Sequence, residues 1–108
     1  MCLSAKGHYN PAGVDHGTHV GDLGNLHADS AGNYKLSNHG KGGQNTINLS
    51  GPDSIVGRAC VLHAGKDDLG KGKGKKEKGS KASGNAGPRI ACGVVGLVAG
   101  PPKAAPAF

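Results

Sequence analysis

The stretch "HYNPAGVDHGTHVGD", from His8 to Asp22, concentrates side chains that can bind a metal ion. A zinc ion takes four nitrogen, sulfur or oxygen ligands in a tetrahedron, and three imidazoles with one carboxylate provide that number and type. The candidate ligands are His8, His16, His19 and Asp22. Glycines between them allow the backbone to turn sharply around an ion. Spacing alone leaves two interpretations open, a metal site and a histidine-rich polar loop.

A second group of candidate residues lies after position 60. His63 ends the segment "RACVLH" and is either a ligand brought in from a second element or a half-buried histidine. Asp67 and Asp68 follow it, and a metal-bound histidine usually donates its second N–H to a carboxylate or carbonyl. Either aspartate could therefore accept that bond. Arg89 beside a metal would be a fixed positive charge for an anionic substrate, and elsewhere it would be a surface arginine.

A basic run from Lys66 to Lys81 contains seven of the 13 lysines and arginines in a chain of formal net charge +6. Such a run is most often a solvated loop, and it attracts anions of any kind. Nucleic acid is disfavoured as a partner because base stacking needs aromatic rings. The chain has only Tyr9, Tyr34 and Phe108.

The secondary-structure elements that must position these residues have few apolar side chains from which to form a core. Only 19 of the 108 residues are Leu, Val, Ile or Phe, whereas 21 are Gly. The length allows one domain. A glycine-rich chain with so few core residues needs a metal, a disulfide or a partner to fold stably.

Segments typical of strands are separated by Gly, Asn, Asp and Pro, which favours an all-β barrel or sandwich of about four strands with long loops. The best candidates are residues 54–64, where Cys60 is interpreted as a small buried residue, and 89–100. Weaker candidates are 19–29, 32–38 and 46–51. No stretch has helical periodicity, so the lysine- and glycine-rich run is predicted to be a loop.

Residues 1–98 are predicted to form the domain and residues 99–108 a Pro/Ala-rich tail, because proline lacks the amide donor that a sheet needs. Three cysteines are an odd number, and no apolar leader segment is visible. No apolar run reaches the length of a membrane span. We therefore expect a cytoplasmic protein that does not associate with a membrane.

Five stretches occur in an order that resembles the copper–zinc superoxide dismutases of the eukaryotic cytosolic type. They are "GHYNP", "HVGDLGN", "SGPDSIVGRACVLH", "DDLGKG" and "GNAGPRIACGVVGL". Together they cover the chain from Cys2 to about Leu97, and "HVGDLGN" and "GNAGPRIACG" are close to family signatures. The resemblance implies a Greek-key antiparallel β-barrel, with copper and zinc as cofactors, superoxide as substrate and a homodimer as the assembly.

The resemblance also implies a role for each candidate residue. His8 would bridge copper and zinc and carry a proton during catalysis, and His63 would bind copper. The other zinc ligands would be His16, His19 and Asp22. Asp67 would link the two metal sites, Arg89 would guide superoxide, and Cys2 and Cys92 would form a disulfide. The residues that steer the substrate toward the metal would be Lys71, Lys73, Lys75, Lys76, Lys78 and Lys81.

Three departures from the family pattern modify these expectations. Roughly the first third of the family sequence has no counterpart, including a segment that supplies two copper ligands, so we expect reduced activity unless water, another chain, His27 or His39 replaces them. Only two residues separate His16 from His19, which leaves open whether both imidazoles reach one ion. The steering run is unusually rich in lysine. The alternative function is a zinc-binding, self-associating structural module.

Overall fold

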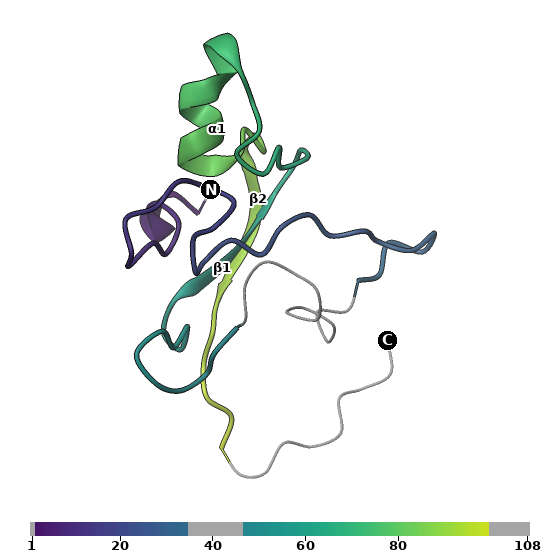
Figure 1. The fold of residues 1–108 in the computed structure, drawn as a ribbon. Helices are drawn as coiled ribbons and strands as arrows, with labels where there is room; N and C mark the ends of the chain where they lie inside the picture. The colour runs from purple at the N-terminus through teal and green to yellow at the C-terminus, as the bar shows by residue number, and fades with distance from the viewer. Residues whose placement is uncertain (1, 35–46, 100–108) are drawn as a thin grey trace.

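A two-stranded antiparallel sheet lies at the centre of the computed structural model, which describes residues 2–34 and 47–99 (Figure 1). Strand β1 is Ala59–His63 and strand β2 is Arg89–Val94. Val61 lies opposite Cys92 and Leu62 opposite Ala91, and an irregularity then places His63 opposite Arg89. The extra residue on β2 thus brings His63 and Arg89 together at one end of the sheet.

In the ranges that the structure describes, three short helical segments accompany the sheet. A 3₁₀ turn, η1 (Leu3–Ala5), lies near the N-terminus, and a second, η3 (Gly74–Lys76), leads into the helix α1 (Glu77–Ser83). An ion pair of 2.9 Å between Glu77 and Lys81 supports α1, since these residues are four positions apart. Gly84 ends the helix with a left-handed backbone (φ 73°), and its N–H donates to Ser80.

The interior of the described part of the chain is mostly polar. Ala86 is its only buried hydrophobic residue, whereas His16, His19, Asp22 and Ser80 are all buried. Large apolar side chains lie on the surface, with Leu97 and Val98 more than 80% exposed. Hydrophobic burial therefore contributes little, and the polar contacts among the buried residues must hold this part of the chain together.

Two predictions about secondary structure were wrong. The four expected strands reduce to two in the described ranges: residues 22–29 have no regular structure, and Asn48 forms only an isolated bridge with Ser54. The lysine- and glycine-rich run contains α1 rather than only a loop. Residues 35–38 of the 32–38 candidate and residues 100–108 of the tail lie outside the described residues.

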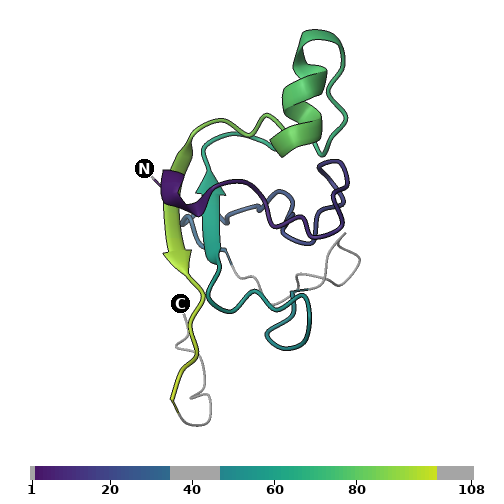
Figure 2. The ribbon, with the colours of Figure 1, turned by 90° about the vertical axis from the view of Figure 1, so that its left-hand side faces the viewer.

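The segment from His8 to Asp22 and helix α1 lie next to each other, to one side of the sheet (Figure 2). The His16 N–H donates to the Lys81 carbonyl over 2.8 Å, which ties this segment to the end of α1. Within the described ranges, no helix has the length and apolar character needed to cross a membrane.

Candidate metal centre

Three histidines and one aspartate meet in a cluster whose possible ligand atoms all lie within 4.8 Å of one another. Asp22 Oδ1 lies 2.7 Å from His8 Nδ1 and 3.1 Å from both His16 Nδ1 and His19 Nδ1. His8 Nδ1 lies 3.2 and 3.4 Å from the other two Nδ1 atoms. Ligands bonded to zinc at about 2.1 Å lie roughly 3.4 Å apart in a tetrahedron, so the donor set fits that ion.

The short spacer between His16 and His19 forms a tight turn that directs both rings inward. Asp22 Oδ2 accepts hydrogen bonds from the backbone N–H groups of Gly17, over 2.6 Å, and His19, over 3.0 Å. Gly17 has φ 97° and packs so closely against the Leu69 carbonyl that a Cβ atom would lie 2.7 Å from its oxygen. The two-residue spacer therefore allows both imidazoles to reach the same point.

Hydrogen bonds at the far nitrogens orient two of the rings. His16 Nε2 lies 2.7 Å from Asp67 Oδ1, and His19 Nε2 lies 2.8 Å from the Val14 carbonyl oxygen. When each Nε2 donates its proton there, Nδ1 carries a lone pair that faces the cluster. This is the tautomer that a metal ligand requires.

Asp22 is ionised in this cluster. Its burial, at 6% exposure, by itself raises the pKa of the carboxyl group. Hydrogen bonds from His8 and the Gly17 N–H outweigh that effect and lower the pKa to about 2. A buried carboxylate beside three imidazoles supplies the negative charge that a divalent cation needs.

A second histidine, His63, lies near the His8 ring. His63 Nδ1 donates to the Gly87 carbonyl over 2.9 Å, which leaves its Nε2 as the possible ligand. The His8 and His63 ring centroids are 6.3 Å apart. Of the spare histidines, His27 is exposed and His39 lies outside the described residues. Within the described residues, this second possible metal position therefore has two imidazoles, those of His8 and His63.

Asp67, rather than Asp68, contacts a histidine of the cluster. Its Oδ1 accepts from His16 and from the Leu69 N–H, over 2.7 Å each. Asn25 fixes the backbone at this point, since its side-chain amide donates to the Asp67 carbonyl and accepts from the Asp67 N–H. Sequence reasoning did not single out Asn25, although it ends the quoted stretch "HVGDLGN".

Asp68 instead anchors helix α1. Its Oδ1 accepts from the Ser80 hydroxyl over 2.6 Å, and its Oδ2 accepts from Asn85 over 2.9 Å. The bond from the Ser80 hydroxyl has the largest effect on the pKa of Asp68. Together with the bond from Asn85, it lowers this pKa below its usual value. The role of Ser80 was also missed, because only the tertiary structure brings it to the aspartate.

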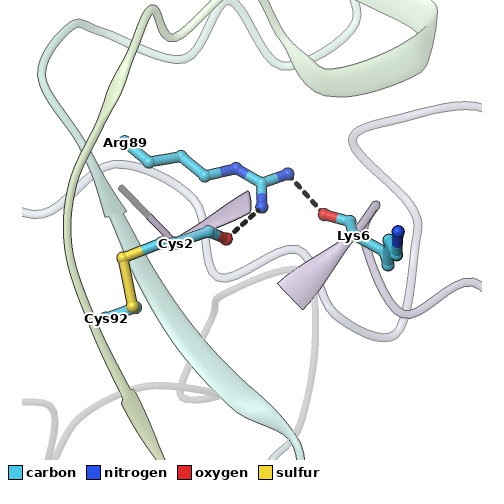
Figure 3. Close-up of a disulfide and its surroundings, with 4 residues drawn as sticks. All are labelled: Cys2, Lys6, Arg89 and Cys92. Atoms are coloured by element: carbon cyan, nitrogen blue, oxygen red, sulfur yellow. Dashed lines mark hydrogen bonds between the residues drawn. A yellow bond between two sulfur atoms is a disulfide. The ribbon is translucent and has the colours of Figure 1, made fainter. Parts of the chain in front are cut away.

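A disulfide and an arginine clamp join η1 to β2 (Figure 3). Cys2 and Cys92 are bonded, with Cα atoms 6.0 Å apart. Arg89 donates from Nη1 to the Cys2 carbonyl over 2.8 Å and from Nη2 to the Lys6 carbonyl. Cys2 and Lys6 each have φ 60°, a strained conformation for residues with a Cβ atom. The two hydrogen bonds therefore hold the η1 turn in this conformation and also fix the position of the Arg89 guanidinium.

Cys60 is exposed, so its interpretation as a buried residue was wrong. Because side chains alternate along a strand, Cys60 shares a face of β1 with Leu62, which is 37% exposed. That face of the sheet is open in the described part of the molecule.

The lysines expected to steer an anionic substrate lie on the turn after Asp68, on η3 and on α1, all at the surface. They are Lys71, Lys73, Lys75, Lys76, Lys78 and Lys81. Lys81 forms the ion pair with Glu77, which raises the pKa of the lysine.

Comparison with known proteins identifies the family. The family model "Copper/zinc superoxide dismutase (SODC)" matches residues 1–95. The chain is 51% identical over 102 residues to "Superoxide dismutase [Cu-Zn]" of Neurospora crassa, covering 89% of this chain and 62% of that protein. The protein of that name from Schizosaccharomyces pombe is 48% identical, with the same shares covered.

The solved structure titled "Crystal Structure Analysis of the clock protein EA4" matches with a TM-score of 0.71 and 42% identity, covering 90% of this chain and 61% of that one. The chain thus spans about 62% of the length of the curated relatives that it matches. The resemblance noted in the sequence is confirmed, and the chain belongs to the copper/zinc superoxide dismutase family.

Proposed function

We propose that this chain takes part in the disproportionation of superoxide to oxygen and hydrogen peroxide, with zinc held by His8, His16, His19 and Asp22 and copper held by His8 and His63. The observation that carries the proposal is the position of His8. Its Nδ1 belongs to the zinc-type cluster, while its ring lies beside His63. A single imidazole is therefore available to both metal positions.

Copper, when bound, would supply the one-electron couple that dismutation needs. The remaining tasks belong to side chains of this chain. His8 would hold a proton at Nε2 in the half of the cycle that forms peroxide. Arg89, fixed by two carbonyl oxygens, would present a stationary positive charge to superoxide. The lysines on η3 and α1 would raise the local concentration of the anion, so the rate should fall as ionic strength rises.

We further propose that the activity of this chain is much lower than is usual for the family. The described residues provide two imidazoles at the copper position, and Cu(II) prefers a tetragonal set of nitrogen and oxygen ligands. Copper should therefore bind weakly unless water or another chain supplies further ligands.

Elemental analysis of the metal-loaded protein, run beside a superoxide assay, tests these points. We expect one zinc per chain, less than one copper, and low activity. His63→Ala should remove copper and activity but keep zinc, whereas the matched variant His19→Ala should remove zinc. A family-typical rate from the unassisted chain would contradict the reduced activity, and copper retained by His63→Ala would contradict the assigned ligand.

A zinc-binding, self-associating structural module is the second candidate function. It is favoured by a complete zinc-type donor set next to a sheet that has two strands within residues 2–34 and 47–99, with Val94, Leu97 and Val98 exposed. Zinc without copper, no activity, and a mass of two or more chains by sedimentation would support the module. The homodimer and the cytoplasmic location remain predictions.

A further inference from the structure

One side of the helical segment formed by η3 and α1 is lined with lysines. Lys75, Lys78 and Lys81 follow one another at intervals of three residues, which places them along one side of the helical segment; we name these three the lysine face. Ser80, on the opposite side, has no exposed surface. Both ribbon views show α1 at one end of the molecule, projecting away from the sheet (Figures 1 and 2).

The lysine face keeps most of its positive charge. Glu77 pairs with Lys81, and it is the one acidic residue between Lys71 and Lys81. Asp15 also lies close enough to raise the pKa of Lys81, after the larger effect of Glu77. Asp67 and Asp68 accept hydrogen bonds from His16 and Ser80. Across the described ranges, no other lysine between positions 66 and 81 forms an ion pair. The cations of this segment therefore outnumber the acids available to neutralise them.

Helix α1 is fixed in place, so the lysine face is held in position rather than carried on a free loop. The Ser80 hydroxyl donates to Asp68 and accepts from the Gly72 N–H over 2.8 Å. Asn85 joins the Asp68 carboxylate to the Lys76 carbonyl at the start of the helix. A charged surface that is already fixed in one conformation before binding loses less conformational entropy when it binds.

We propose that the lysine face docks an acidic polypeptide segment, rich in Asp or Glu. A second copy of this chain does not fit, because both copies carry a net charge of +6. Nucleic acid fits poorly: residues 66–84 contain no aromatic residue and no arginine. The three lysines also span only about 9 Å along the helix axis, which is short for the roughly 6–10 phosphate contacts common in nucleic-acid binding.

This role is distinct from substrate steering. Superoxide is a single small anion that only needs a favourable field, whereas an acidic segment can contact several lysines at once and stay bound. The proposal does not depend on dismutase activity, and it is tested without superoxide. Failure of one proposal thus leaves the other standing.

The experiment measures the binding of a fluorescein-labelled 20-residue polyglutamate peptide to the zinc-loaded protein by fluorescence anisotropy. We expect binding at low ionic strength that weakens as salt is added. The double variant Lys75→Gln/Lys78→Gln should bind about fivefold more weakly, the effect of losing two exposed ion pairs. The matched control Lys6→Gln/Lys66→Gln removes the same charge from two other exposed positions and should bind like the parent.

Equal weakening in both double variants would overturn the proposal, since only net charge would then matter. Tighter binding of a 20-base-pair DNA duplex than of the peptide would also overturn it, in favour of a nucleic-acid surface. The unfolding midpoints of the two double variants should be equal. Weaker binding by Lys75→Gln/Lys78→Gln alone then reflects the lost lysines rather than a loss of folding, and it supports the proposal.

Discussion

Replacing Gly84 by alanine should damage the metal centre from outside the donor set. A Cβ atom at this position would overlap Asp67 Oδ1 and His16 Nε2 and would lie 2.7 Å from Asp67 Cγ. The hydrogen bond between His16 and Asp67 could then not form in its present geometry. Gly84 also has φ 73°, which alanine adopts with strain.

The size of the effect follows from these two contributions. A left-handed alanine costs about 1–2 kcal/mol. Loss of a hydrogen bond to a charged group costs about 1.5–3 kcal/mol. The free energy of unfolding should therefore fall by about 2.5–5 kcal/mol, a large share of the total for a small domain. Zinc affinity should fall roughly 10- to 100-fold, as is common when the partner of a ligating histidine is disturbed.

The measurement is the thermal unfolding midpoint of the zinc-loaded protein, together with a competitive zinc titration. Gly74→Ala is the matched control, because Gly74 has φ 60° but no atom within 4 Å of a built Cβ. It should lose only the conformational contribution and keep its zinc affinity. If the two variants have equal midpoints and equal zinc affinities, overlap with Asp67 and His16 does not matter and the reasoning is refuted.

Three further outcomes are expected. Chelation of zinc should lower the unfolding midpoint steeply, measured by circular dichroism, because Ala86 is the only buried hydrophobic residue in the described ranges. Reduction of the Cys2–Cys92 disulfide should cost about 4 kcal/mol in chemical denaturation, since it closes a long loop. The folded-state pKa of Asp68 is lowered, so its contribution to stability is present above the unfolded pKa and lost as pH falls through the folded one. Ser80→Ala should move the acid unfolding transition to higher pH, and an unchanged transition would exclude that coupling.

The four donors of the zinc-type cluster could be named from the sequence because they lie in one short segment, although the family resemblance was needed to decide between a metal site and a histidine-rich loop. The distance from His8 to Asp22 is only fourteen residues, so local turns are enough to bring the donors together. Residues that act across the fold were harder to find. Asn25 and Ser80 are ordinary polar residues until the chain brings them to Asp67 and Asp68.

The errors in secondary structure have physical causes. Residues 19–29 contain the spacing of small and apolar residues expected of a strand, but His19 and Asp22 belong to the turn around the cluster. A strand also needs a neighbour to pair with, and within the described ranges β1 and β2 pair only with each other. Helix α1 was missed because Gly79 interrupts a lysine-rich run, while the Glu77–Lys81 pair that supports it is a weak signal.

The bond between Cys2 and Cys92 makes most of the chain a covalent ring. Cleavage of one peptide bond in the ring, for example by trypsin after the exposed Arg58, would produce two peptides still joined through sulfur. His8 to Asp22 would lie on one peptide, and His63 to Arg89 on the other. Such a nicked molecule would migrate as one species without reductant and as two with it. The donors of both metal positions would stay tethered, so the centre could re-form from two peptides as a single unit.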